Sequence, residues 1–433
     1  MTQLHCTSRQ ADFRGWRACY LENRFVRLVA VPDIGGRVMA YDLGPYAFLY
    51  VDPKLAGKLF TAEENQGDGS LAAWKNYGGD KTWPAPQGWE RPDQWHGPPD
   101  PVLDTGRYTL NELGSDNGSA TVRMTSPPDP RTGLQIGRQF TIERDSSRVQ
   151  VQLTFTNISD QPIRWSIWDV VQLRAERIEA GGRLSYEPSC VVTTPVNPAS
   201  RFPRKFHVMF GAEDNPQWQV DAQHQLFSAP YQWQIGKVGL DSAAGWIAFS
   251  NPAEGYAFCE RFTYEPGAEY PDDGSTVEIW TVGAGEVGNL NFAGSDIYHV
   301  ETEILSPLRT LAPREKTSFT LEWAAARAHG RVIDVAPGGL STERLTLQPA
   351  GAFWQVRGVF GIFDAGRVVL EWFDGHGETL RTDDCANADP LTVVVLDRLI
   401  TPPAHAKQVR AVVVAMDGTQ RELHAPVALP SII

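Results

Sequence analysis

Residues 148–173 read RVQVQLTFTNISDQPIRWSIWDVVQL, and they predict a β-rich fold. The first half alternates β-branched or aromatic residues with polar ones and ends at Asn157, which is the pattern of a short strand followed by a turn. In the second half, Asp169 lies between Trp168 and Val170 in an otherwise apolar run. We therefore expect Asp169 to be buried, and burial raises the pKa of a carboxyl group.

The same strand pattern recurs along the whole chain. Short β-branched or aromatic runs end at Gly, Pro, Asn or Asp in RFVRLVAVP (24–32), GRVMAYDLG (36–44), GWIAFSN (245–251), STVEIWTVG (275–283) and TSFTLEWAAA (317–326). No window of helical length carries an apolar stripe with a 3.6-residue period. The 31 Pro and 39 Gly residues supply turns between many strands. The sequence thus predicts an all-β fold.

The segment HGRVIDVAPGGLST (329–342) has the composition of a domain boundary. Four strand-like runs follow it within the last part of the chain, which is enough for a small separate β-sandwich. We expect one domain over residues 1–335 and a small immunoglobulin-like β-sandwich over residues 340–433. The second domain has no cluster of catalytic residue types, so we interpret it as a packing or interaction module.

Charge and composition exclude several functions. Lys and Arg number 39 against 52 Asp and Glu, a formal net charge of −13, which disfavours nucleic acid and anionic membranes as partners. The five cysteines are scattered, which favours free thiols in a reducing compartment. Neither a signal peptide nor a transmembrane run is found, so we expect a cytoplasmic protein. The 14 Trp residues suit stacking on sugar rings, although most can serve the core.

A long segment rich in Pro, Gly and Trp runs from Gly67 to Thr105. Loops of this length in a compact domain are usually functional or disordered, and four Trp residues argue against disorder. We expect an ordered loop at the mouth of a site. Within it, Asn76, Asp80 and Lys81 beside Trp83 suit saccharide binding. A structural turn pinned by an Asp–Lys pair is the open alternative.

Three stretches carry a family resemblance. VPDIGGRVMAYDLG (31–44) is similar to the glycine-glycine-arginine hairpin of aldose 1-epimerases, residues 156–173 resemble that family's central strand pair, and residues 298–325 resemble its closing strands. The resemblance covers roughly residues 10 to 330 and implies an antiparallel, galactose mutarotase-like β-supersandwich. NYGGDKTWPAPQGW (76–89) and YPDDGSTVEIWTVG (270–283) look like hallmarks of an uncharacterised branch of this superfamily.

The resemblance also implies a chemistry. In a mutarotase a carboxylate removes the proton from the anomeric hydroxyl while an acid, usually His, protonates the ring oxygen. The position equivalent to the family's His falls at or beside Asp169, so this chain departs from the pattern there. Asp169 with a pKa raised by burial is one candidate acid. His96, delivered by the loop, is another, although a lone loop His is more often merely exposed.

On the strand His299-Val-Glu301-Thr-Glu303, alternation places the three titratable side chains on one face. Such a row suits either a cleft or an exposed edge strand that uses charge against aggregation. Aldose 1-epimerases have a glutamate base near this position, so the resemblance favours a cleft-lining strand. We expect Glu303 to be the base, with Glu301 the next choice, and His299 to bind substrate.

Further polar or charged residues are candidates for a role: Lys237, Gln172, the Asp272–Asp273 pair and Glu278. Lys237 and Gln172 are expected to reach the cleft and bind substrate. Asp272, Asp273 and Glu278 match no calcium loop, and a tight turn explains them. No metal-binding, nucleotide-binding or serine-hydrolase motif is found, so we expect no metal and no cofactor.

The predicted function is therefore that of a carbohydrate-active protein with a saccharide ligand. An aldose 1-epimerase-like isomerase is the default, and a lyase or glycosidase using paired carboxylates is an alternative. A non-catalytic sugar-binding or scaffolding protein that kept the fold is a further alternative, because a fold alone does not determine function. The sequence leaves the sugar and the oligomeric state open.

Overall fold

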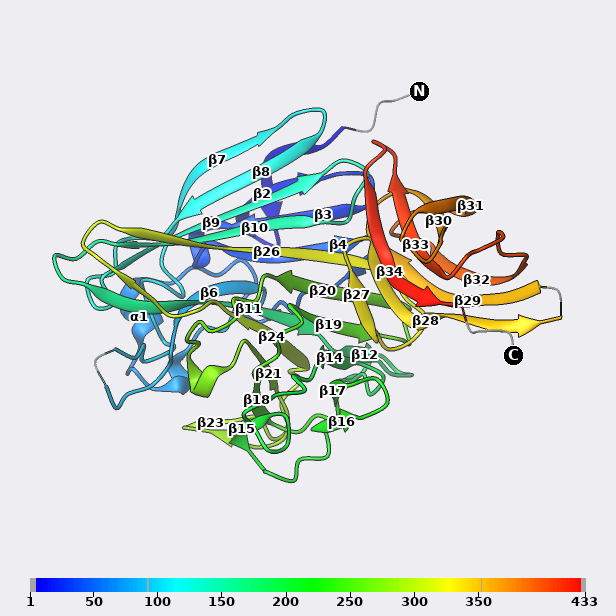
Figure 1. Cartoon of the computed structure of the whole chain (residues 1–433). Coiled ribbons are helices and arrows are strands. Elements are labelled where there is room, and N and C mark those ends of the chain that lie inside the picture. Colours follow the sequence, from blue (N-terminus) through cyan, green and yellow to red (C-terminus); the bar gives the residue numbers. More distant parts are fainter. Residues whose placement is uncertain (1–4, 92, 352, 430–433) are drawn as a thin grey trace. The chain divides into compact units, whose positions relative to one another are not determined.

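The computed structural model describes residues 5–91, 93–351 and 353–429. It divides into two compact units: the first holds residues up to 144, 149–249 and 260–323, and the second holds 145–148, 250–259 and 324 onward. Nearly all regular structure is β, and its sheets are antiparallel, so the predicted all-β fold is confirmed (Figure 1). Whether residues 340–433 form an independent immunoglobulin-like domain stays a prediction.

The first large sheet carries the pocket described below. Among the described residues it has twelve strands, of which ten follow one another in the order β1 (Thr7–Phe13), β2 (Trp16–Glu22), β3 (Val26–Val31), β4 (Arg37–Leu43), β6 (Asp80–Ala85), β11 (Ile163–Arg174), β24 (His299–Leu305), β21 (Val277–Thr281), β18 (Gly236–Leu240) and β15 (His207–Gly211). The other two, β5 (Tyr46–Ala47) and β25 (Arg309–Leu311), pair with β4 and β11.

The second large sheet has ten strands within the described part of the chain. Their order is β16 (Gln219–Asp221), β17 (Leu226–Pro230), β14 (Val191–Pro195), β19 (Trp246–Asn251), β20 (Tyr256–Phe262), β26 (Lys316–Arg327), β10 (Val149–Asn157), β9 (Leu134–Glu143), β8 (Ser119–Thr125) and β7 (Thr109–Ser115). Side chains of the two sheets meet in a buried core: the Trp323 ring lies 6.1 Å from Tyr41 of β4 and 5.6 Å from Phe140 of β9. The first unit is therefore a large antiparallel β-sandwich.

Short elements complete the first unit. The helical ones are α1 (Ala62–Gln66) and the 3₁₀ turns η1 (Pro32–Ile34), η2 (Leu71–Ala73) and η3 (Asp272–Gly274). Two small hairpins pair β12 (Glu176–Ile178) with β13 (Leu184–Tyr186) and β22 (Glu286–Val287) with β23 (Leu290–Asn291). No helix of the described residues has the length and apolarity needed to cross a membrane.

The second unit contains the predicted small C-terminal β-sandwich. One four-stranded sheet orders β27 (Asp334–Ala336), β28 (Gly339–Ala350), β29 (Phe353–Ile362) and β32 (Val393–Ile400). The other orders β31 (Thr379–Ala388), β30 (Gly366–Phe373), β33 (Gln408–Ala415) and β34 (Gln420–Ala428). Its core includes the buried side chains of Trp354, Phe360, Leu370, Trp372 and Val413.

The proline-rich segment is more regular than the sequence predicts, because strand β6 runs through it. Pro84 lies within β6, where it is opposite Ile167 of β11. Proline is rare in central strands since it has no N–H to donate. Here β4 meets β6 at the single pair Val38–Asp80, so the β6 edge at Pro84 has no ladder partner in β4. This arrangement explains how a strand forms in a sequence that reads as a loop.

Candidate functional site

A pocket of about 700 Å³, counted to its open mouth, lies in the first unit over strands of the first sheet. Its floor comes from neighbouring strands β6, β11, β24, β21 and β18, and its walls from the segments near η2 and the β22–β23 hairpin. The lining is mainly apolar with a few polar groups: Leu71, Trp74, Asn76, Trp83, Gln87, Pro98, Trp168, Gln172, Lys237, Trp280, Val282, Val287, Leu290, Phe292, His299, Glu301 and Glu303. This mixture is typical of small-molecule sites.

Strand register determines which side chains form the floor. Glu301 of β24 is opposite Gln172 of β11 on one side and Trp280 of β21 on the other. Glu303, two residues along, is opposite Glu278 of β21. Because directly opposite residues share a face of the sheet, these side chains all point to the pocket side.

One polar cluster on the floor centres on Glu301. Its Oε1 lies 3.1 Å from Lys81 Nζ, and Gln172 Nε2 donates to the same oxygen. His299 Nε2 lies 3.8 Å from that oxygen and 3.3 Å from Gln172 Nε2. The imidazole of His299 stacks on the Tyr50 ring with centroids 4.8 Å apart. Glu301 is thus held by one cation and one amide donor.

This environment determines the charge of the cluster. Burial by itself raises the pKa of Glu301, but Lys81, His299 and the Gln172 hydrogen bond outweigh it, so the pKa is lowered. Burial lowers the pKa of Lys81, and Glu301 opposes that change only in part. Burial lowers the pKa of His299 to about 4. At neutral pH, Glu301 is therefore ionised and His299 is neutral.

A second cluster centres on Glu303. Trp168 Nε1 donates to Glu303 Oε2 at 2.8 Å, and Lys237 Nζ lies 3.0 Å from the same oxygen. Lys237 Nζ also lies 2.7 Å from Glu278 Oε2. The ammonium sits 4.3 Å from the centre of the Trp168 ring, in cation–π contact. One lysine thus serves two buried carboxyl groups.

In the second cluster one cation, Lys237, faces two carboxyl groups, Glu278 and Glu303. Burial raises the pKa of Glu303 to about 8, since Lys237 only partly offsets burial and the nearby Glu278 and Glu301 add to it. Burial likewise raises the pKa of Glu278 to about 7. Burial lowers the pKa of Lys237, but Glu278 and Glu303 outweigh it, so that pKa is raised. At neutral pH, Glu303 is protonated.

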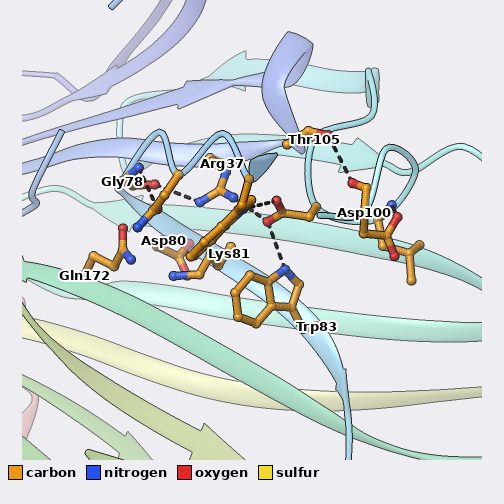
Figure 2. A network of polar contacts seen from close by, with 12 residues as sticks. Arg37, Gly78, Asp80, Lys81, Trp83, Asp100, Thr105 and Gln172 are labelled. Atoms are coloured by element: carbon orange, nitrogen blue, oxygen red, sulfur yellow. Dashed lines mark hydrogen bonds and ion pairs between the residues drawn. The ribbon is translucent and has the colours of Figure 1, made fainter. Parts of the chain in front are cut away.

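An Arg37–Asp104 ion pair, fully buried, supports the tryptophan wall of the pocket. Asp104 accepts hydrogen bonds from Trp74 Nε1 at 2.7 Å and Trp83 Nε1 at 3.1 Å. Arg37 Nη1 donates to the carbonyl of Gly78 at 2.9 Å, and Figure 2 shows Arg37 beside Gly78. The glycine-glycine-arginine hairpin thereby fixes both the aromatic wall and the turn before β6.

That turn needs glycine. Gly78 has φ +91°, and a Cβ added there would lie 2.2 Å from the Tyr50 carbonyl oxygen. Gly79 has φ +74°, and its Cβ would lie 2.4 Å from the Val38 carbonyl oxygen. Only glycine combines positive φ with so close an approach of backbone. The turn brings Asn76 to the pocket edge and Lys81 beneath Glu301.

Most of the residues assigned from sequence come together. Asn76, Trp83, Gln172, Lys237, His299, Glu301 and Glu303 line the pocket. Lys81 lies just beneath the lining, 4.7 Å from the centre of the Trp83 ring and paired with Glu301. The row His299–Glu301–Glu303 faces the pocket and does not form an exposed edge strand, since β24 lies between β11 and β21.

Asp169, Asp80 and His96 are not brought into the pocket, contrary to expectation. Asp169 is opposite Thr82, whose hydroxyl donates to it, and alternation turns both toward the core between the two sheets. Asp80 shares that face and forms a buried ion pair with Arg138. His96 is exposed, and it does not line the pocket. The acid predicted at Asp169 therefore lies in the core, whereas Glu303, whose pKa is raised to about 8, lies on the pocket face.

Sequence reasoning missed the β22–β23 hairpin, which brings Val287 and Leu290 to the pocket. The Asn289 side chain accepts a hydrogen bond from the Ala72 amide at 2.9 Å and so joins the hairpin to η2. The available signal was the Gly288-Asn289 pair between short runs, a known two-residue hairpin turn. Trp280 and Glu278 were also missed as site residues, although both alternate with Val277 and Ile279 in a recognised strand.

Three buried polar atoms of lining residues have no hydrogen-bond partner within the described chain: Gln172 Oε1, His299 Nδ1 and Glu303 Oε1. Buried polar atoms are normally hydrogen-bonded, so these atoms are suited to a polar ligand. Among the described residues, no group of three His, Cys, Asp or Glu side chains is arranged to hold a metal ion. The arrangement offers one ionised and one protonated carboxyl group for acid–base chemistry.

Fold and site together define an all-β sandwich protein with a pocket lined by tryptophan and carboxyl side chains. A family model described as "Domain of unknown function (DUF4380)" matches residues 17–326, and the chain belongs to this family. No significant match is found among curated proteins.

Several solved structures are similar to the chain. A galactose mutarotase-like protein from Clostridium acetobutylicum is 12% identical with a TM-score of 0.46, over 75% of this chain and 99% of that one. A galactose mutarotase-like protein from Lactobacillus casei is 10% identical with a TM-score of 0.44, over 71% and 99%. A candidate aldose 1-epimerase from Klebsiella pneumoniae is 10% identical with a TM-score of 0.49, over 74% and 82%.

Proposed function

We propose that this protein is a carbohydrate-active enzyme that interconverts the anomers of a sugar by acid–base catalysis. The observation that carries the proposal is that Glu301 and Glu303 share one face of one strand while their surroundings shift their pKa values in opposite directions. Two carboxyl groups whose surroundings separate their pKa values supply a base and an acid at the same pH. Residues two apart on a strand lie roughly 6.5 Å apart, a distance that a sugar ring can span.

In the proposed reaction, Glu301 removes the proton from the anomeric hydroxyl and Glu303 donates its proton to the ring oxygen. The bond between the anomeric carbon and the ring oxygen breaks, which gives an open-chain aldehyde. After rotation about the adjacent carbon–carbon bond, the former ring oxygen attacks the other face of the aldehyde. It returns its proton to Glu303, and the new anomeric oxygen takes back the proton from Glu301.

The lining supports a sugar as the ligand. Trp74, Trp83 and Trp280 offer aromatic surface, which suits stacking on sugar rings. The unpartnered Gln172 Oε1 and His299 Nδ1 are suited to hydrogen bonds with hydroxyl groups. The saccharide ligand and the roles of these residues belong to the proposal.

The test is anomer exchange measured by NMR for a panel of free sugars. The wild-type chain should accelerate exchange of at least one sugar. Glu301→Gln and Glu303→Gln should each lower the exchange rate constant by about 10²–10⁴-fold, since each removes an acid or base, with little loss of affinity. Glu213→Gln, at an exposed glutamate, is the control.

Three outcomes would redirect or overturn the proposal. Binding without exchange in the wild type would favour a non-catalytic sugar-binding protein. An unsaturated or hydrolysed product would favour a lyase or a glycosidase. Wild-type rates in both Gln variants would show that Glu301 and Glu303 are not the catalytic pair.

A further inference from the structure

Glu278 is a buried carboxyl group that the reaction above does not use. Glu278 is fully buried and lies directly opposite Glu303 across β21 and β24. Lys237 Nζ lies 2.7 Å from Glu278 Oε2 and 3.0 Å from Glu303 Oε2. The two carboxyl groups therefore compete for one cation.

We propose that Glu278 is a positioning residue that keeps Glu303 in its protonated, proton-donating form by sharing Lys237 with it. This inference rests on the proposed role of Glu303 as the acid. If Glu303 alone faced Lys237, the ion pair would favour its carboxylate. With Glu278 present, one cation faces two carboxyl groups, and two like charges at such a distance do not both ionise readily.

The remaining charges around Glu303 support this account. The titratable groups that act on Glu303 or on its two partners come from β18, β21, β24, η3 and, from behind the floor, β20: Lys237, Glu278, Glu301, Asp272 and Glu260. Lys237 is the one cation among them, and the rest are carboxyl groups. Besides Glu303, Glu278 is the carboxyl group of this set that contacts the Lys237 ammonium directly, at 2.7 Å.

Glu278 and Glu303 titrate as a pair and not as separate groups. Burial is the largest cause of the raised pKa in each. The charge of Glu278 raises the pKa of Glu303, whereas a side-chain hydrogen bond with Glu303 lowers the pKa of Glu278. When Glu303 gives its proton to a ring oxygen, Lys237 can then pair with the new carboxylate. The same proton returns when the ring closes, so the pair ends each cycle unchanged.

The test compares Glu278→Gln, Glu278→Asp and Lys237→Met in the full chain, with Glu213→Gln as an exposed control. In Glu278→Gln, the alkaline limit of the exchange rate should move to lower pH by about one unit or more, with KM unchanged. Lys237→Met should move that limit to higher pH, and Glu278→Asp should restore the wild-type profile. A role limited to folding would not shift the limit in opposite directions. Superimposable profiles for Glu278→Gln and wild type would overturn the proposal.

A second measurement needs no turnover. Carbon-13 NMR of labelled Glu carboxyl carbons, with Glu303→Gln to identify the Glu303 signal, gives the titration midpoint of Glu303 directly. The midpoint should be lower in Glu278→Gln than in wild type. A lower midpoint without sugar turnover would refute the proposed function and support the role of Glu278. Turnover with an unchanged midpoint would refute the role of Glu278 alone.

Discussion

Lys81 Nζ lies 3.1 Å from Glu301 Oε1, although the two residues are 220 positions apart in the chain. Both side chains are nearly inaccessible to solvent, so their attraction is weakly screened. Lys81 forms an ion pair with Glu301, whereas Lys237 forms ion pairs with both Glu278 and Glu303. This unequal supply of cations distinguishes two glutamates that are only two residues apart.

The first prediction concerns the pH dependence of anomer exchange. The lowered pKa of Glu301 keeps the base ionised at neutral pH and in the mildly acidic range. The pKa of Glu303 is about 8, so the acid loses its proton as the pH rises through that value. We expect a rate plateau near neutral pH and a fall above about pH 8. Exchange rates followed by NMR across the alkaline range check this, and a rate that rises through pH 8 would contradict it.

The second prediction concerns the stability of the fold at acidic pH. Burial lowers the pKa of His299 from 6.5 to about 4 in the folded chain. Between these values the unfolded chain binds a proton that folded His299 does not bind, so stability falls as the pH is lowered from 6.5 toward 4. The loss attributable to His299 is on the order of 3 kcal/mol. Unfolding free energies of wild type and His299→Gln, measured in urea at several pH values, should therefore converge or cross over this range. Parallel pH curves would contradict the prediction.

The third prediction concerns the support of the tryptophan wall. Asp104→Asn removes the partner of buried Arg37 and weakens the acceptor for Trp74 and Trp83. Breaking a buried ion pair typically costs about 3–5 kcal/mol of unfolding free energy. Sugar affinity should also fall, since the two tryptophans of the wall lose their shared acceptor. Asp160→Asn is the matched control, because its pair with Arg314 is exposed. Equal unfolding free energies for the two variants would count against this role of Asp104.

The fourth prediction concerns the turn before β6. Gly78→Ala places an L side chain at a backbone φ of +91° and brings its Cβ to 2.2 Å from the Tyr50 carbonyl oxygen. Gly267→Ala places an L side chain at a φ of +77°, where no neighbouring atom lies within 4 Å of the added Cβ, so it isolates the conformational cost. We expect Gly267→Ala to destabilise by about 1 kcal/mol and Gly78→Ala by clearly more. Thermal unfolding of both variants checks the difference, and equal melting temperatures would show that the turn relaxes freely.

Much of the architecture follows from local patterns. Short β-branched runs between turn residues predicted the all-β fold, because side-chain shape and turn preference act over a few residues. Alternation along His299, Glu301 and Glu303 predicted that all three share a face. The Trp-rich segment was expected at the mouth of a site, and Trp74 and Trp83 do line the pocket.

The sequence by itself determined which side chains alternate, but only the tertiary structure decided which face of each strand lines the pocket. Asp169 and Gln172 lie three residues apart on β11 and therefore point to opposite faces. Pairing of Gln172 with Glu301 puts Gln172 on the floor and leaves Asp169 in the core between the sheets. The charge states of Glu301 and Glu303 likewise depend on Lys81 and Lys237, which reach them from distant parts of the chain. Electrostatic energy in a buried site depends on distances in space, and those distances exist only once the strands that carry these groups have paired.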